Sequence, residues 1–361
     1  MNALLVLFLV LDILISLGML IIRVGGHNSK KGDWEEGDST SQYSPKILVI
    51  LPVKGKDFEM KINFQSLLDQ SYDNYRIIAV ADREDDESLE VIKELGMAHI
   101  ISETECQGCS GKVKAILTAL LKFSDFDYYV IADSDIRVDR NWLQVLVEPL
   151  KDKLVGVTTT FPIFVARGGF WSHFKMYWGL IGRSMMESEI TRFAWGGSLA
   201  FRRDLVDESD LKYFSTFVSD DIALMKICKS KGLHVSYRPG ARVFIHSKES
   251  FLDFVEWSNR QTALSISSSE KIFYYGVAYY LAIIFLLVTS VVLTSLGIWY
   301  FSFFLLLFMY VAIDNLRKVP IRNLYFLPST FLTFFFYLYN LVAARGKKKI
   351  LWRGREYSLY P

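Results

Sequence analysis

Two carboxylates stand at the end of an expected strand. Asp133 and Asp135 flank Ser134 directly after the aromatic and apolar run 126–132, which is typical of a buried strand. Open α/β sheets bind their ligands outside such strand ends. Carboxylate oxygens suit Mg²⁺ or Mn²⁺, which often join the protein to substrate phosphates. Taken alone, the segment could also be a solvated, Asp-rich turn.

Further carboxylates follow the same pattern. Asp82 ends a second apolar run, and Asp220 and Asp221 follow an aromatic loop and open an expected helix. Each could simply cap a helix. Because they recur within one stretch of chain, together with the basic Arg260 further on, they favour a catalytic site.

The elements that must position these residues alternate between strand and helix. Continuous apolar runs predict buried parallel strands, and helical spacing predicts the segments between them. The expected strands cover 46–53, 75–81, 99–101 and 128–132, and the expected helices cover 61–71, 88–95 and 112–123. This rhythm predicts an α/β domain with a Rossmann-like, mostly parallel sheet.

Beyond Asp135 the regular alternation of expected strands and helices ends. Strands are expected within 155–164, 193–201 and 234–246, and a Trp- and Met-rich segment lies between the first two. No G-x-G-x-x-G or P-loop follows the first strand, so neither a dinucleotide nor a Walker-type site is indicated.

Apolar blocks flank the polar domain. Hydrophobic residues make up 51% of the 361 residues, and they concentrate in 3–22, 272–313 and 324–344. The first lacks a basic leader and a cleavage site, so residues 1–24 are expected to be a retained transmembrane anchor rather than a signal peptide. The second is about twice as long as one membrane span requires and predicts two transmembrane helices. Residues 25–45 are expected to form a linker.

Charge predicts the orientation of the chain. A net charge of +2 gives no reason to expect a nucleic-acid partner. Basic residues follow the first apolar block and surround the last one, so the positive-inside rule places the central domain on the cytoplasmic side of the membrane. A basic cytoplasmic tail over 345–361 then requires 314–344, broken by Pro328, to be re-entrant or membrane-associated.

The cysteines indicate little. Cys106 and Cys109 have the spacing of a metal or redox pair, but no second pair completes a zinc site. With Cys228, they predict three thiols in a reducing compartment without disulfides.

The motifs together resemble a known family. The chain resembles the inverting glycosyltransferases of family 2, and most closely the family 21 branch typified by ceramide glucosyltransferase. The resemblance is carried by Ala79–Asp86, by Gly111–Ala115, by the D-S-x-I-R-V segment at Asp133–Val138, by Gly196–Ser198 with Phe201–Leu205, by Asp220–Asp221 and by Trp352–Tyr357. It implies a GT-A fold over 46–271, with N- and C-terminal transmembrane helices.

The resemblance also implies roles. Asp82 would lie at the nucleotide base and ribose, Lys112 on the donor side, and Asp133 and Asp135 at the metal and diphosphate. Asp221 would be the catalytic base.

One motif departs from the family pattern. The family usually has (Q/R)-x-x-R-W after the base, whereas this chain has Trp257, Arg260 and Gln261 at its defining positions. These three are candidate donor-binding residues, and Trp257 could instead be an interfacial anchor.

The chemistry fits these roles. Mn²⁺ or Mg²⁺ would neutralise part of the charge on a nucleotide diphosphate leaving group, Arg260 and Lys112 would add fixed positive charge, and Asp221 would take the proton of an acceptor hydroxyl.

The expected function is transfer of a sugar, suggested to be glucose from a UDP-sugar, to a lipid acceptor at the membrane. The alternatives are a processive polysaccharide synthase-like transferase and a non-catalytic membrane scaffold that retains the fold.

Overall fold

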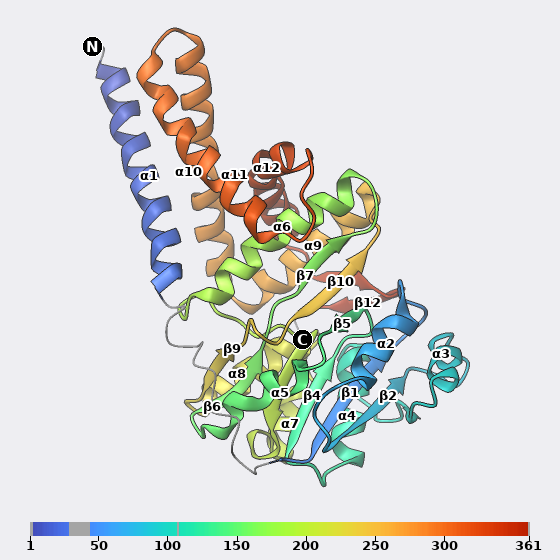
Figure 1. The fold of residues 1–361 in the computed structure, drawn as a ribbon. Coiled ribbons are helices and arrows are strands. Elements are labelled where there is room, and N and C mark those ends of the chain that lie inside the picture. Colours follow the sequence, from blue (N-terminus) through green and yellow to red (C-terminus); the bar gives the residue numbers. More distant parts are fainter. Residues whose placement is uncertain (1–2, 29–43, 107, 360–361) are drawn as a thin grey trace. The chain divides into compact units, whose positions relative to one another are not determined.

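The computed structural model describes residues 3–28, 44–106 and 108–359, and these form two compact units (Figure 1). One unit holds the central sheet and draws on residues 33–164, 189–247 and 348–361. The other holds the long apolar helices and draws on 1–32, 165–188 and 248–347. Most of the expected linker 25–45 falls outside the described residues.

A seven-stranded sheet forms the centre of the first unit. Its strands are β1 (Ile47–Val53), β2 (Tyr75–Ala81), β3 (His99–Ile101), β4 (Tyr128–Ala132), β6 (Val155–Thr159), β8 (Ser198–Arg202) and β9 (His234–Tyr237). Their order is β3-β2-β1-β4-β8-β6-β9. β1 pairs in parallel with both β2 and β4, and β8 is antiparallel to both of its neighbours. The predicted mostly parallel, Rossmann-like sheet is confirmed.

Apolar side chains on both faces explain why these strands read as continuous apolar runs. In β1, Leu48 and Ile50 pack into a cluster that includes residues of helices α4 and α8, while Ile47 and Val49 on the opposite face are equally buried. A sheet covered on both sides needs no polar face. The prediction from sequence therefore succeeds best here.

Helices and short elements complete the first unit. They are α2 (Met60–Leu68), α3 (Ser88–Glu94), α4 (Gly111–Lys122), α5 (Trp142–Val147), the 3₁₀ turns η2 (Glu148–Lys151) and η3 (Arg203–Leu205), α7 (Glu208–Phe214) and α8 (Asp220–Ser230). β5 (Ile136–Val138) pairs antiparallel with β10 (Val243–Ser247), and β11 (Lys349–Trp352) pairs antiparallel with β12 (Arg355–Ser358).

Two details differ from expectation. The predicted strand over 155–164 breaks at Thr160, after which β7 (Ile163–Ala166) leads the chain out of this unit. Pro162 has no N–H to give to a ladder, which is a reason for the break. The expected helix 61–71 ends at Leu68.

The second unit consists of helices. They are α1 (Ala3–Asn28), α6 (Phe170–Glu187), α9 (Phe251–Ser268), α10 (Lys271–Ser295), α11 (Ser302–Lys318) after the turn η4 (Trp299–Phe301), and α12 (Phe326–Ala344). Among the described residues, four of these are long and apolar enough to cross a membrane: α1, α10, the segment Trp299–Lys318, and α12. The expected membrane helices at both ends of the chain are confirmed.

Polar contacts tie these helices together. Asp12 of α1 is fully buried, and both of its carboxylate oxygens accept from the Thr289 hydroxyl of α10, at 3.0 and 2.9 Å. Asn340 of α12 accepts from the Trp178 indole of α6 and donates to Asn259 of α9. A polar group in an apolar environment is costly unless it is bonded, so these contacts favour one arrangement of the helices over others.

Candidate active site

The carboxyl ends of β1, β2 and β4 carry the candidate site. The strand order places β1 between β2 and β4 and makes the gap between β1 and β4 the point where the chain reverses its direction of winding. Lys54 and Asp57 follow β1, Asp82 follows β2, and Asp133 and Asp135 follow β4. These three loops therefore meet at one edge of the sheet.

Lys112 joins two parts of the site. Ser110 caps α4 by accepting from the Val113 N–H at 3.1 Å, and this places Lys112 in the first turn of the helix. Its Nζ lies 2.8 Å from Asp133 Oδ1 and 3.1 Å from Asp220 Oδ1, and it donates to the Gly196 carbonyl at 3.1 Å. One ammonium group thus holds the β4 loop, the start of α8 and the loop before β8 together.

The charges in this cluster depend on burial. Burial opposes the charge on Lys112, but Asp133 and Asp220 outweigh it and raise the pKa of Lys112 above its ordinary value. Burial raises the pKa of Asp220 to about 7, an effect that Lys112 partly offsets and that Asp221 and Asp133 strengthen. Asp220 Oδ2 is buried and has no hydrogen-bond partner among the described residues. Burial thus keeps the pKa of the Asp220 carboxyl well above its ordinary value.

Asp221, the predicted catalytic base, lies next to this cluster. Its Oδ2 accepts from the Gly196 N–H at 3.0 Å, and its Oδ1 accepts from the Ile222 N–H at 2.7 Å and from the Ser219 hydroxyl. Three donors fix the orientation of the carboxylate, and the helix N-terminus favours its negative charge. The sequence named Asp221 but gave Asp220, the residue that actually pairs with Lys112, no role.

Two glycines allow this close approach. A Cβ on Gly196 would lie 2.6 Å from Asp220 Oδ2, and a Cβ on Gly197 would lie 2.1 Å from the Trp195 ring. The Gly197 carbonyl also accepts from the Asp133 N–H at 3.1 Å, which continues the pairing of β4 with β8. Any side chain at position 196 would push Asp220 away from Lys112.

Asp82 lies at the other end of the site. Arg355 of β12 pairs with it at 2.7 Å, and Lys54 lies 3.9 Å away. A Cβ on Gly111 would lie 4.0 Å from Asp82 Oδ1 and 3.5 Å from the Tyr357 hydroxyl. Asp82 is therefore next to the first turn of α4, one residue before Lys112.

Side-chain contacts with the segment that follows β1 hold the loop that carries Asp133 and Asp135. The Ser134 hydroxyl donates to Asp57, and Arg353 pairs with the same carboxylate at 2.5 Å. Arg137 of β5 pairs with Glu59, which also contacts the His246 ring at 3.0 Å. The sequence missed Asp57 and Lys54, although their place just after β1, at the carboxyl end of a parallel strand, could have indicated them.

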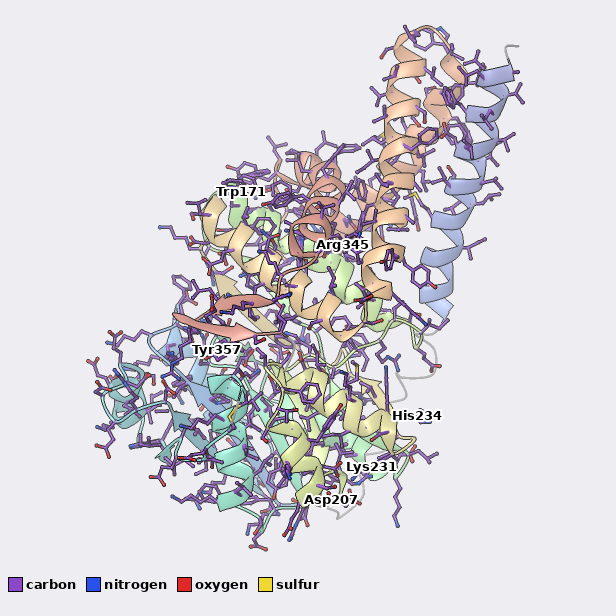
Figure 2. All side chains as sticks on the ribbon, turned by 180° about the vertical axis from the view of Figure 1, so that it is seen from behind. Trp171, Asp207, Lys231, His234, Arg345 and Tyr357 are labelled. Atoms are coloured by element: carbon purple, nitrogen blue, oxygen red, sulfur yellow. A yellow bond between two sulfur atoms is a disulfide. The ribbon has the colours of Figure 1, made fainter. Side chains whose placement is uncertain are left out.

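The predicted residues of the altered (Q/R)-x-x-R-W motif lie in the other unit, on α9. The Trp257 ring contacts Trp178 with centroids 4.9 Å apart, and the Lys175 ammonium lies 4.4 Å from its centre. It belongs to an aromatic cluster of α6, α9 and α12 (Trp171 is labelled in Figure 2). Packing accounts for Trp257, and the donor-binding roles of Trp257, Arg260 and Gln261 stay predictions.

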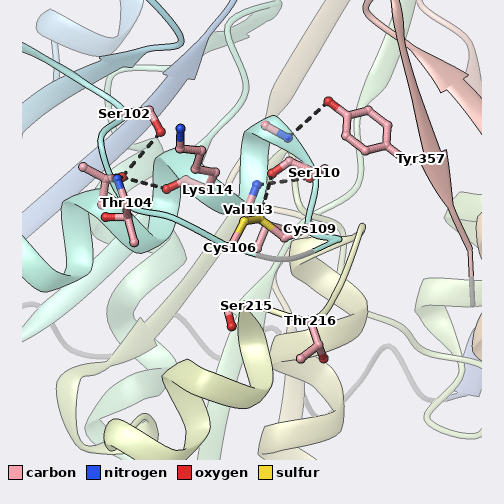
Figure 3. Close-up of a disulfide and its surroundings, with 12 residues drawn as sticks. Ser102, Thr104, Cys106, Cys109, Ser110, Val113, Lys114, Ser215, Thr216 and Tyr357 are labelled. Carbon is pink, nitrogen blue, oxygen red and sulfur yellow. Dashed lines mark hydrogen bonds between the residues drawn. A yellow bond between two sulfur atoms is a disulfide. The ribbon is translucent and has the colours of Figure 1, made fainter. Parts of the chain in front are cut away.

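The cysteine prediction is wrong for one pair. The structure joins Cys106 and Cys109 in a disulfide in the loop before α4, with Cα atoms 5.9 Å apart, a separation that a disulfide spans (Figure 3). No thiolate remains there for zinc. Cys228 is a free, buried thiol whose pKa is raised by burial to about 11.

A known protein family matches almost the whole chain. The model of glycosyl transferase family 21 matches residues 9–361. The chain belongs to this family. It is therefore a glycosyltransferase that uses a nucleotide-sugar donor, as the motifs indicated.

Two solved structures are similar to this family 21 chain to different degrees. The mannosyltransferase PcManGT from Pyrobaculum calidifontis, solved in complex with GDP-Man and Mn²⁺, has a TM-score of 0.57 and 16% identity over 92% of this chain and 97% of its own. Glucosyl-3-phosphoglycerate synthase from Mycobacterium tuberculosis, in complex with Mn²⁺, UDP and phosphoglyceric acid, has a TM-score of 0.41 and 16% identity over 67% of this chain and 81% of its own. At this identity, the likeness to PcManGT shows the GT-A fold of the family 21 chain.

Proposed function

We propose that this family 21 enzyme transfers a hexose, with glucose from UDP-glucose as the first candidate, to the hydroxyl group of a lipid, with inversion at the anomeric carbon. The observation that carries the proposal is the arrangement around Lys112, which brings Asp133, Asp220 and the Gly196 loop together beside Asp221. The residues that we propose for the donor side and for the acceptor side would thus act within one connected cluster.

Asp221 would act as the general base. Its carboxylate is held by Gly196, Ile222 and Ser219. Oδ2, which accepts from the Gly196 N–H, keeps a second lone pair for an acceptor hydroxyl. Lys112 would hold the donor-side loop in place and contribute positive charge near the leaving group. Preorganised charge of this kind does not need to reorganise during the reaction.

The residues fit a divalent cation on the donor side. In the described part of the chain, no cluster of three or more Asp, Glu, His or Cys residues is arranged to hold a metal. Mg²⁺ and similar ions, however, are commonly bound by one or two carboxylates together with substrate phosphates. Asp133 and Asp135 would hold the ion, and Asp133 is already fixed by Lys112. When bound, Mn²⁺ or Mg²⁺ would act as a Lewis acid on the leaving diphosphate. PcManGT, which shares the fold, was solved with Mn²⁺ and a nucleotide sugar.

The apolar helices support a lipid acceptor on the cytoplasmic side. An acceptor with a lipid tail reaches a membrane-anchored enzyme by lateral diffusion, and the basic tail favours the cytoplasmic face. The β11–β12 hairpin after α12 belongs to the same unit as the sheet and bonds to Asp82 and Gly111. The hairpin and the sheet must then be on one side of the membrane. This supports the proposal that 314–344 does not cross the bilayer completely.

A donor screen tests the function. The purified full-length chain in detergent, with Mn²⁺, is incubated with UDP-glucose, UDP-galactose, UDP-N-acetylglucosamine or GDP-mannose and a lipid extract, and sugar-labelled lipid is measured. We expect transfer from UDP-glucose with an inverted linkage, and transfer about 10²- to 10⁴-fold slower by Asp221→Asn. Hydrolysis of the donor without labelled lipid would contradict the lipid acceptor, and a retained anomeric configuration would contradict the base mechanism.

A further inference from the structure

The C-terminal hairpin makes an unusual set of contacts with the donor-side loops. Arg353 and Arg355 lie at and just after its turn, and Tyr357 lies on β12. Arg353 pairs with Asp57 at 2.5 Å and donates to the Lys54 carbonyl at 3.2 Å. Arg355 pairs with Asp82 at 2.7 Å. One short hairpin therefore reaches the ends of both β1 and β2.

The turn of the hairpin holds Arg353 in the left-handed region of φ, which residues other than glycine rarely adopt. Trp352 pairs with Arg355, which leaves Arg353 and Gly354 as a two-residue turn with φ values of 50° and 73°. Two positive φ values are typical of a type I′ turn, which favours Asn, Asp or Gly at its first position. Residues kept in such regions against their preference concentrate at functional sites. The ion pair with Asp57 is a reason for arginine here.

Arg353 faces the predicted diphosphate loop. Its partner Asp57 accepts from Ser134, which lies between Asp133 and Asp135. Burial opposes the charge on Arg353, but Asp57 outweighs it, and Asp135 and Asp133 also act on the guanidinium, so that its pKa is raised. A planar guanidinium in this place can bind phosphate oxygens in a bidentate manner.

Arg355 and Tyr357 face the predicted nucleoside end instead. The Tyr357 hydroxyl accepts from the Gly111 N–H at 3.2 Å, and Figure 3 shows it directed toward the start of α4, beside the disulfide. A Cβ on Gly111 would lie 3.8 Å from Arg355 Nη1. Arg355, Tyr357 and Asp82 therefore converge on the first turn of α4.

We infer that the β11–β12 hairpin is part of the donor-binding site and that its two arginines have different tasks. Arg353 binds the diphosphate, and Arg355 positions Asp82 and contacts the nucleoside. This inference rests on the proposed nucleotide-diphosphate donor. It makes the β11–β12 hairpin an element that binds the donor, and not only a tail that follows the membrane helices.

Binding of UDP and UMP separates the two tasks. Isothermal titration of the full-length chain in detergent with Mn²⁺ compares wild type, Arg353→Ala and Arg355→Ala. A charge-assisted contact is worth about 1.5–3 kcal/mol, so loss of one contact weakens binding about 10- to 100-fold. We expect Arg353→Ala to weaken UDP by this factor and UMP by less than about threefold, whereas Arg355→Ala weakens both ligands similarly.

Lys349→Ala is the matched control. Lys349 lies on β11 and is 62% exposed, and among the described residues its ammonium pairs with Glu356 across the hairpin, so its loss should leave UDP binding unchanged. Arg353→Lys and Arg355→Lys keep the charge without the planar fork and should show intermediate affinities. A thermal melt within about 2 °C of wild type, which corresponds to about 1 kcal/mol or less, shows that each variant is folded.

The results separate failure of the hairpin inference from failure of the proposed function. If wild type binds UDP and both alanine variants bind it equally well, the hairpin is not part of the donor site, but the proposed function stands. Equal losses for UDP and UMP in both variants contradict the division of tasks. If wild type binds neither UDP nor UMP, the proposed donor is wrong and the inference falls with it.

Discussion

Replacement of Lys112 by methionine should destabilise the sheet unit strongly. The side chain of Lys112 is 11% exposed and that of Asp220 is 4% exposed, and the ammonium is shared with Asp133 at 2.8 Å. Methionine has a similar length but no charge. It would leave both oxygens of Asp220 without a hydrogen-bond partner among the described residues, since Oδ2 already lacks one.

The size of the loss follows from burial. Removal of one partner from a buried ion pair costs about 3–5 kcal/mol, because the other charge stays buried without compensation. For a unit of this size, each kcal/mol lowers the melting temperature by about 2–4 °C. Lys112→Met should therefore melt about 6–20 °C below wild type at pH 8, a difference that tryptophan fluorescence of the full chain in detergent can follow.

The loss should depend on pH. The Asp220 pKa is raised from 3.8 to about 7, so the stability that protonation of Asp220 contributes is fully present below 3.8 and is lost as the pH rises through 7. Lys112 lowers the pKa of Asp220 in wild type, so the pKa should rise further in the variant. Lys112→Met should consequently cost less at pH 5, where Asp220 is neutral in both proteins, than at pH 8.

A second substitution tests the assignment to Asp220. Adding Asp220→Asn to Lys112→Met removes the buried charge and should recover part of the loss at pH 8, with a coupling of about 0.5–3 kcal/mol. Lys114→Met, two residues further along α4, is the control, since Lys114 makes no ion pair with any described residue. A melting temperature of Lys112→Met within about 2 °C of wild type, or a loss independent of pH, would refute the reasoning.

Four further outcomes are expected. Asp221→Asn should keep donor binding but lower kcat about 10²- to 10⁴-fold, and a rate within threefold of wild type would assign the proton to another residue. EDTA should abolish sugar transfer and Mn²⁺ should restore it, whereas full activity without metal would remove the metal from the mechanism. Single cysteines at Ser44 and Ser358 should react with a membrane-impermeant reagent from the same side of sealed vesicles, and labelling from opposite sides would show that α12 spans. Thr289→Val should lower the melting temperature of the full chain, because the buried Asp12 loses its partner at a cost of about 1–3 kcal/mol; an unchanged melting temperature would show that this contact does not hold α1 to α10.

The sheet could be predicted from the amino-acid sequence, and so could the position of several candidate site residues at its strand ends. Strands buried on both faces appear as continuous apolar runs, and β1, β2 and β4 were predicted to within one residue for that reason. Carboxylates at the ends of those strands, such as Asp82 and Asp133, stand out because they interrupt apolar runs. The membrane helices could also be predicted, since an uncharged apolar stretch of about 18 residues or more is typical of a transmembrane helix.

Which of these residues contact one another depends on the folded chain. Lys112 bonds to a carbonyl 84 positions away, and Arg355 bonds to a carboxylate 273 positions away. No local pattern marks such pairs, because they depend on strand order and on the return of the last residues of the chain to the sheet. Asp220 shows the difference most clearly. Its sequence neighbours suggest only a helix N-terminus, whereas burial in the folded unit raises the pKa of its carboxyl to about 7 against the opposing effect of Lys112.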